Sequence, residues 1–303
     1  MEKSNYIPKL SIITINYNNA DGLKQTLHSV LEQTYQEYEY IIIDGGSNDE
    51  SKQHILACQD RLGYWCSEKD KGIYNAMNKG ILKATGEYIL FLNSGDYLHD
   101  NKVLEKVIPN LSGEDIVYGD LLLLDNGGKT KLRVYPDRLS LRYMLSDTIG
   151  HPASFIKRDL FSGSLYSENL KIVSDWEFFL KKIIKCQASY KHIALLVSVF
   201  DLTGISSTNI ELCQKEREIV LHNEFSFLVC EELKQFYLFQ DQPLFSLYRK
   251  IMVSKRFQKR IRILISALWK IHCLFHKNNK GAPDKPCGVG RADANPKLLL
   301  NDT

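Results

Sequence analysis

A short apolar run that ends abruptly in polar residues is the feature that most constrains how this chain can fold. Residues 88–92 read Tyr-Ile-Leu-Phe-Leu, and Asn-Ser-Gly-Asp follows at 93–96. A run this short predicts a buried strand rather than a helix. Strands buried on both faces belong to sheets that helices cover, and ligands bind at the carboxyl ends of such strands. We therefore expect Asp96 on the rim of a ligand site, where it holds a cation or a hydroxyl group. The alternative is a polar turn after a core strand, because turns are rich in these residues.

The composition predicts a sizeable folded domain and excludes several classes of protein. The chain has 303 residues, which predicts one large domain or one domain with an extension. Its net charge of +3 gives no sign of a nucleic-acid partner. No run approaches the roughly 18 apolar residues of a membrane span, and residues 1–6 lack the apolar core of a signal peptide. The seven cysteines include no Cys-x-x-Cys pair, which predicts reduced thiols in a cytosolic protein.

The first part of the chain repeats one pattern of strand, polar loop and helix. Apolar runs at 10–15, 40–43 and 62–66 predict strands, and apolar residues at helical spacing follow each of them. Ser47 and Glu50 have the spacing of a capping pair, which predicts that a helix starts at Ser47. This repetition predicts parallel βαβ units with right-handed crossovers.

The pattern changes after residue 96. Two predicted strands, 116–124 and 130–135, flank the turn sequence Asp-Asn-Gly-Gly at 125–128. Further strands are predicted at 151–156 and 193–200. Hairpins therefore replace the βα alternation, and we expect a mixed, mostly parallel sheet flanked by helices.

The remainder of the sequence is predicted to be helical and then disordered. Residues 249–277 keep apolar side chains at spacings of three and four, with a cluster of Lys and Arg at the start. Such a basic amphipathic helix suits the surface of an anionic membrane, whereas a core-packing helix or a dimer seam is the alternative. Residues 278–303 are rich in Gly, Pro, Asn and Asp and predict a disordered tail. The expected organisation is an α/β domain at 1–207, a helical extension at 208–277 and the tail at 278–303.

Several familiar catalytic motifs are absent from the sequence. There is no Gly-x-Gly-x-x-Gly after the first strand, no Walker-type Gly-Lys-Ser/Thr and no Gly-x-Ser-x-Gly elbow. Polar groups nevertheless follow four predicted strands and can converge at one edge of the sheet. They are Asn16 and Tyr17, Asp44, Asp70 and Lys71, and Asn93 and Asp96.

Four motifs in this order resemble the family 2 glycosyltransferases, more narrowly bacterial enzymes that build surface polysaccharides. They are Ser-Ile-Ile-Thr-Ile-Asn-Tyr-Asn-Asn at 11–19, Ile-Ile-Ile-Asp-Gly-Gly-Ser at 41–47, Asp-Lys-Gly-Ile-Tyr-Asn-Ala-Met-Asn-Lys-Gly at 70–80 and Phe-Leu-Asn-Ser-Gly-Asp at 91–96. The resemblance covers about residues 8–207. It implies a Rossmann-like GT-A fold, a nucleotide-sugar donor, a divalent cation (Mn²⁺ or Mg²⁺) and inversion at the anomeric carbon.

The resemblance assigns four residues to the donor. Tyr17 and Asp44 match positions that hold the nucleoside, with Tyr17 against the base and Asp44 accepting from uracil N3–H. A turn-forming role is the alternative for Asp44. Asp70 and Lys71 match the loop near the ribose and the diphosphate, and a solvated charge cluster is the alternative.

The resemblance assigns five further residues to the metal and the acceptor. The segment 93–96 matches the Asp-x-Asp region but keeps one carboxylate, so Asp96 is the expected metal ligand, with Asn93 beside it. Asp175 matches the position of the catalytic base, with Glu177 as the second candidate, whereas helix capping is the alternative role for Asp175. His151 matches a position ahead of the acceptor region and is expected to touch the acceptor, unless it is a packed structural histidine.

These residues predict an inverting glycosyltransferase of surface-polysaccharide synthesis. We expect it to move a hexose or N-acetylhexosamine from a UDP-sugar to a lipid-linked or oligosaccharide acceptor. The basic helix predicts a cytoplasmic protein held peripherally at the inner face of the membrane. The alternative is a non-catalytic, membrane-associated glycosyltransferase-like protein in the same assembly, because one carboxylate of the metal motif is missing. A sugar nucleotidyltransferase is disfavoured, because the sequence lacks an N-terminal Gly-rich phosphate loop.

Overall fold

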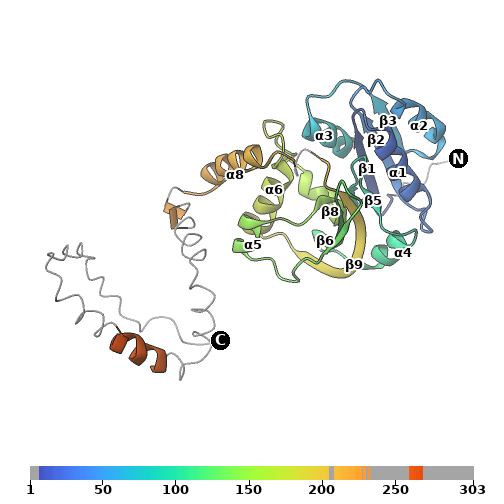
Figure 1. Cartoon of the computed structure of the whole chain (residues 1–303). Coiled ribbons are helices and arrows are strands. Elements are labelled where there is room, and N and C mark those ends of the chain that lie inside the picture. Colours follow the sequence, from blue (N-terminus) through green and yellow to red (C-terminus); the bar gives the residue numbers. More distant parts are fainter. Residues whose placement is uncertain (1–6, 205–207, 227, 230, 233–258, 269–303) are drawn as a thin grey trace. The chain divides into compact units, whose positions relative to one another are not determined.

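The computed structural model describes residues 7–204, 208–226, 228–229, 231–232 and 259–268 (Figure 1). The chain divides into two compact units, Met1–Cys230 and Glu231–Thr303.

One nine-stranded sheet organises the described part of the first unit. Its strand order is β3-β2-β1-β4-β8-β6-β9-β5, and β7 pairs with β6 beside this path. The strands are β1 Leu10–Asn16, β2 Glu39–Asp44, β3 Tyr64–Ser67, β4 Tyr88–Phe91, β5 Tyr97–Leu98, β6 Ile116–Leu124, β7 Thr130–Arg133, β8 Ser154–Lys157 and β9 Tyr190–Asp201.

Helices cover the first strands on two sides. In Figure 1, α3 lies on one side of β1–β3, and α1 and α2 lie together on the other. The helices are α1 Ala20–Leu31, α2 Ser51–Ala57, α3 Ile73–Lys83, α4 Val103–Val107, α5 Leu141–Ser146, α6 Ser174–Phe179 and α8 Ile210–Glu224. A π-helix, Leu180–Lys185, continues α6. Short 3-10 turns connect several of these elements, among them His151–Ala153.

Strands β1 to β4 form the parallel part of the sheet that the apolar runs predict. β1 and β4 are buried throughout, whereas β3, at the end of the strand order, is half-buried. Every residue of β1 is buried, and Ile12, Ile13 and Ile42 have no exposed surface. A Cβ atom at Gly80 of α3 would lie 2.5 Å from Ile13 Cγ2, so only a glycine lets this helix pack so closely on β1. Layers of helix, parallel sheet and helix bury both faces of these strands.

The parallel register brings the polar strand ends to one edge of the sheet. Asn16 lies opposite Asp44, and Asp44 lies opposite Ser67. All three residues end their strands, so their side chains meet where the chain leaves the sheet toward its helices. The expected convergence of polar groups at the carboxyl ends of β1, β2 and β3 is therefore confirmed.

The second half of the sheet is mixed. β8 pairs antiparallel with both β4 and β6, whereas β9 runs parallel to β6 and antiparallel to β5. β6 and β7 form the predicted hairpin, with Leu124 opposite Thr130. Its turn is tight because Asp125 Oδ1 accepts hydrogen bonds from the backbone N–H groups of Gly127 and Lys129 at 2.9 Å each. The change of pattern after residue 96 thus marks a real change in strand direction.

Two local predictions are wrong. No helix starts at Ser47, because its hydroxyl donates to Asp44 and accepts from the backbone N–H of Asn18 instead of capping. Helix α2 begins only at Ser51, with Glu50 as N-cap residue. The strand predicted from residue 151 begins at Ser154, because Pro152 lies in the 3-10 turn that precedes it.

The first unit extends beyond the boundary expected at residue 207, because α8 packs onto it. Glu216 is 6% exposed, and its carboxylate accepts hydrogen bonds from the backbone N–H groups of Lys171, Ile172 and Val173 at 2.7, 2.9 and 3.3 Å. These bonds join α8 to the loop that leads into α6.

The second unit is described only in part. Residues 259–268 are helical, within the predicted segment 249–277, and the rest of that segment and the predicted tail 278–303 lie outside the described residues. Ile263, Leu264, Ile265 and Leu268 are each more than half exposed. Among the described residues, no helix combines the length and the hydropathy that crossing a bilayer requires.

Candidate active site

A cleft of about 1050 Å³ opens at the carboxyl ends of the parallel strands. Loops after β1, β2 and β4 line one part, and the β6–β7 hairpin, the segments 147–152 and 171–176, and α8 line the other. Six predicted site residues line it, namely Tyr17, Asp70, Asn93, Asp96, His151 and Asp175. The other three, Asp44, Lys71 and Glu177, are not among the lining residues.

Tyr17 and Asp70 lie beside Gly45 and form a notch in the cleft. A Cβ atom at Gly45 would lie 2.9 Å from Asp70 Oδ2 and 3.2 Å from Tyr17 Cδ2. Any larger residue at 45 would therefore fill the notch. Tyr17 is 68% exposed, so its ring is available to a ligand. Lys79 Nζ lies 2.7 Å from Asp70 Oδ1 and holds that carboxylate in place.

Asp44 is a fully buried carboxylate whose oxygens are all occupied. Oδ1 accepts from Asn16 Nδ2 at 2.8 Å and from Ser47 Oγ at 2.5 Å. Oδ2 accepts from the Ser47 backbone N–H at 3.0 Å and from Ser67 Oγ at 2.6 Å. Although burial opposes ionisation, these hydrogen bonds together hold the pKa of Asp44 below its usual value. A bond to uracil would require one of these four bonds to be exchanged.

Lys71 and Glu177 lie outside the lining of the cleft. Lys71 is exposed outside the cleft, and Lys69, two residues earlier, lines it instead. The Glu177 carboxylate lies 2.8 Å from Lys181 Nζ, one helical turn along.

Asp96, Asn93 and Asp201 line the part of the cleft where a metal is expected. Asp96 is 4% exposed, and its Oδ1 accepts from the backbone N–H of Asp201 at 3.0 Å. The pKa of Asp96 is raised to about 7. Burial is the largest cause and the Asp201 charge acts in the same direction, whereas the His151 charge acts in the opposite direction. Asn93 Oδ1 is buried and has no hydrogen-bond partner in the described structure.

This oxygen set fits a hard divalent cation, which prefers carboxylate and carbonyl ligands and keeps some of its waters. Among the described residues, however, no group of three or more His, Cys, Asp or Glu side chains is arranged to hold a metal alone. A cation here would therefore need ligands from water or from the donor.

A chain of hydrogen bonds connects this segment to the predicted base. Asn93 Nδ2 lies 3.0 Å from His151 Nε2, and His151 Nδ1 lies 3.1 Å from Asp175 Oδ2. Because the amide donates to Nε2, the neutral imidazole carries its proton on Nδ1 and donates it to Asp175. The charges of Asp175 and Asp96 raise the pKa of His151 against the opposing effect of burial.

Tyr74 completes the surroundings of Asp175. Its hydroxyl lies 2.9 Å from Asp175 Oδ1 and 2.5 Å from the backbone oxygen of Ile172. Burial raises the pKa of Asp175, but the hydrogen bond and charge of His151 and the hydrogen bond from Tyr74 outweigh it, so the pKa is lowered. Asp175 is thus an ionised carboxylate in the cleft that can accept a proton.

Several lining residues escape the analysis of the sequence. Asp201 ends β9, where no motif points to it, and Arg133 and Arg217 lie on the hairpin and on α8. Tyr74 lies inside the third motif, but a buried aromatic at helical spacing gives no sign of its hydroxyl contacts.

The comparisons with known proteins agree with this fold. The model of glycosyl transferase family 2 matches residues 11–158. An uncharacterised glycosyltransferase of Mycobacterium tuberculosis (strain CDC 1551 / Oshkosh) is 35% identical over 209 residues, which cover 66% of this chain and 78% of that protein. A PGL/p-HBAD biosynthesis glycosyltransferase of Mycobacterium bovis (strain BCG / Pasteur 1173P2) is 30% identical over 67% of this chain and 81% of that protein.

Solved structures share the fold at low identity. TarS 1–349 of S. aureus, in complex with UDP-GlcNAc, gives a TM-score of 0.52 at 19% identity over 64% of this chain and 58% of that chain. The chain thus spans less than two thirds of that TarS chain. The mannosyltransferase PcManGT of Pyrobaculum calidifontis, in complex with GDP-Man and Mn²⁺, gives 0.51 at 13% identity over 88% of both chains.

The sheet, its flanking helices and the cleft at the strand ends define a glycosyltransferase of the GT-A fold. The chain belongs to glycosyltransferase family 2.

Proposed function

We propose that this enzyme is an inverting glycosyltransferase that uses a UDP-sugar and a lipid-linked or oligosaccharide acceptor in surface-polysaccharide synthesis. The observation that carries the proposal is the ionised Asp175 carboxylate in the cleft, fixed by the Tyr74 hydroxyl at 2.9 Å and the His151 imidazole at 3.1 Å. A buried carboxylate with a perturbed pKa that faces a cleft is a typical mark of a functional site, which supports catalysis.

The proposed reaction is a single displacement. The acceptor hydroxyl oxygen attacks the anomeric carbon of the donor from the face opposite the diphosphate. Asp175 takes the hydroxyl proton, the new glycosidic bond forms, and the bond to the diphosphate oxygen breaks. UDP leaves with the electron pair of that bond, and the configuration at the anomeric carbon inverts. Asn93 and His151 orient the Asp175 carboxylate throughout.

A divalent cation, Mn²⁺ or Mg²⁺, would be held by Asp96 with Asn93 and Asp201 beside it. It would supply positive charge to the diphosphate leaving group. The unpartnered Asn93 Oδ1 and the second oxygen of Asp96 support this assignment, because both are oxygen ligands without a donor in the described structure.

We place the binding site for the nucleotide-sugar donor at the notch formed by Tyr17, Gly45 and Asp70. The exposed Tyr17 ring supports stacking on a base, and Lys69 adds a positive charge to the lining for the diphosphate. Asp44 is proposed to contact the nucleoside through an exchanged hydrogen bond, and Lys71 to reach the diphosphate when the loop carries donor. The complexes of TarS with UDP and UDP-GlcNAc support uridine as the first nucleotide to test.

The membrane half of the proposal rests on the second unit. Lys259, Arg260 and Arg262 are exposed on the same short helix as the exposed residues Ile263, Leu264, Ile265 and Leu268. Basic and apolar side chains together suit an anionic bilayer surface. Charge reversal of Lys259, Arg260 and Arg262 to Glu in the full chain should reduce pelleting with anionic liposomes. Pelleting equal to that of the parent would show that these residues do not bind the membrane surface.

The deciding experiment measures release of UDP from a panel of UDP-sugars with Mn²⁺ or Mg²⁺. GDP-mannose serves as the comparison, because PcManGT was solved with GDP-Man. Slow hydrolysis of one UDP-sugar, lost in Asp175→Asn, would support the donor class and the base together. Hydrolysis of GDP-mannose alone would overturn the choice of uridine, and neither binding nor release of any nucleotide would overturn the proposed reaction.

A further inference from the structure

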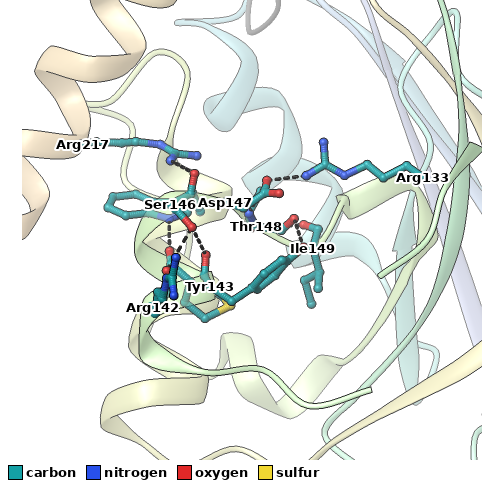
Figure 2. Close-up of polar contacts among 10 residues, drawn as sticks. Arg133, Arg142, Tyr143, Ser146, Asp147, Thr148, Ile149 and Arg217 are labelled. Atoms are coloured by element: carbon teal, nitrogen blue, oxygen red, sulfur yellow. Dashed lines mark hydrogen bonds and ion pairs between the residues drawn. The ribbon is translucent and has the colours of Figure 1, made fainter. Parts of the chain in front are cut away.

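Arg217 reaches the cleft from α8 with most of its hydrogen-bonding capacity unused. Its guanidinium carbon lies 4.8 Å from the centre of the Trp176 ring, and Nη1 donates to the backbone oxygen of Ser146 at 3.3 Å. Figure 2 shows Arg217 and Arg133 approaching the segment at Ser146 and Asp147 from opposite sides of the view. The Nε atom of Arg217 is buried and has no partner in the described structure. A guanidinium has five N–H donors, so a ligand could take several of them.

The neighbouring carboxylates are engaged with other groups. Asp147 is paired with Arg133, and Glu216, the residue before Arg217, accepts from the loop at 171–173. In the part of the chain that the structure describes, Arg217 therefore has no carboxylate partner. Lys171 also lines the cleft, and its ammonium group has no ion pair among the described residues.

These two cations lie on the acceptor side of the cleft. Trp176, over which Arg217 is placed, directly follows Asp175, and Lys171 begins the loop that leads to it. The donor notch is built instead from the loops after β1, β2 and β3. An anion held by Arg217 and Lys171 would therefore belong to the molecule that Asp175 deprotonates.

We propose that Arg217 and Lys171 form a subsite for an oxyanion group carried by the acceptor. This inference rests on the proposed function and adds the chemical class of its acceptor. Arginine binds carboxylate and phosphate oxygens through two parallel N–H groups, and the Trp176 ring holds the guanidinium plane while those bonds form. The oxyanion is a phosphate or diphosphate on a lipid-linked acceptor, or the carboxylate of an acidic sugar.

The test uses the full chain with saturating UDP and Mn²⁺, so that the donor half is occupied. Titration calorimetry compares farnesyl diphosphate with farnesol, which isolates the diphosphate, and glucuronate with glucose, which isolates the carboxylate. The variants are Arg217→Gln and Arg217→Lys, and the matched control is Lys215→Gln. Lys215 lies on the same helix, is 65% exposed and pairs with Glu211 outside the cleft lining.

We expect Arg217→Gln to lower the affinity for the anionic probe by about tenfold or more, beyond any change in UDP affinity, because hydrogen bonds from a charged donor are lost. Arg217→Lys should recover only part of the loss, and Lys215→Gln should bind as the parent does. If binding of farnesyl diphosphate depends on Arg217, the acceptor carries a lipid phosphate. If only the binding of glucuronate depends on Arg217, the acceptor carries an acidic sugar.

Two results would overturn the subsite. One is equal binding of both anionic probes by the parent and Arg217→Gln. The other is a loss of UDP affinity as large as the loss of probe affinity, which would place Arg217 in the donor site. Unchanged UDP affinity in Arg217→Lys shows that the variant is folded. Failure of the proposed function is separate, because the parent itself would then neither bind UDP nor release it from a donor.

Discussion

His151 Nδ1 lies 3.1 Å from Asp175 Oδ2, so the imidazole directly contacts the proposed base. On its other side the same ring contacts Asn93, which belongs to the segment that ends in Asp96. One histidine thus contacts residues of both proposed functions of the cleft, removal of a proton from the acceptor and support of the leaving group.

Replacement of Asp175 by Asn tests the base. The amide cannot take a proton at neutral pH, and loss of a general base costs about 10²- to 10⁴-fold in rate. We expect kcat for transfer to fall within that range. Glu177→Gln is the matched control, because Glu177 is also on α6 but is paired with Lys181 outside the cleft lining. A larger loss of kcat in Glu177→Gln than in Asp175→Asn would make Glu177, and not Asp175, the catalytic base.

Removal of the Tyr74 hydroxyl should move the pH profile. The hydroxyl stabilises the charged form of Asp175, and its loss raises the pKa of that carboxylate. Activity depends on the ionised form, so the acidic limb of the kcat profile should shift to higher pH in Tyr74→Phe. The hydroxyl has one proton, which it shares between Asp175 and the closer backbone oxygen of Ile172. Because that oxygen also loses its donor, the free energy of unfolding should fall by about 1 kcal/mol.

The pH profile separates positioning from packing in this variant. A merely structural role for Tyr74 would lower stability and leave the acidic limb where it is in the parent. Tyr166→Phe is a useful comparison, because this ring lies 5.5 Å from Tyr74 in the same core, and its hydroxyl has no hydrogen-bond partner in the described structure.

Asp96→Asn tests the metal assignment. A pair of unit charges 4 Å apart at an effective dielectric near 20 is worth on the order of 4 kcal/mol, so losing the carboxylate should weaken metal-dependent binding by at least about a hundredfold. UDP binding measured with and without Mn²⁺ reports this loss. Asn93→Ala should cost less, because it removes a neutral ligand. If Asp96→Asn bound UDP and Mn²⁺ like the parent, the cation would not lie at Asp96.

The sequence was sufficient to locate the cleft because strand ends obey a simple geometric rule. Polar residues after β1, β3 and β4 had to meet at one edge once the strands were parallel, and Tyr17, Asp70 and Asp96 do line one cleft. The four hydrogen bonds that the Asp44 carboxylate accepts could not be predicted from the sequence. These bonds come from Asn16, Ser47 and Ser67, which are distributed over three strand ends, and nothing local in the sequence indicates that they fill all four acceptor positions of the carboxylate.

The acceptor side was harder to predict for a related reason. Arg217 and Glu216 lie on α8, beyond the expected domain boundary, and they meet the loop before α6 only through long-range packing. Ser47 illustrates the opposite error, because its capping pattern is locally correct but Asp44 competes for the hydroxyl. Sequence patterns describe neighbours along the chain, whereas these contacts depend on neighbours in space.

Glu216→Gln should loosen the loop that leads to Asp175 at the start of α6. The Glu216 carboxylate accepts three backbone N–H groups through both of its oxygens while 6% exposed, and a glutamine amide keeps only one acceptor oxygen, so at least one N–H group is left without an acceptor. We expect the free energy of unfolding, measured in urea, to fall by about 1–3 kcal/mol. Because this loop leads directly into α6, whose first turn holds Asp175, kcat should also fall under conditions where the variant remains folded. Glu218→Gln, an exposed neighbour on α8, is the matched control and should change neither quantity. Equal effects of the two substitutions would mean that the loop is held without Glu216, and that α8 contributes to the cleft through the lining residues Cys213 and Arg217.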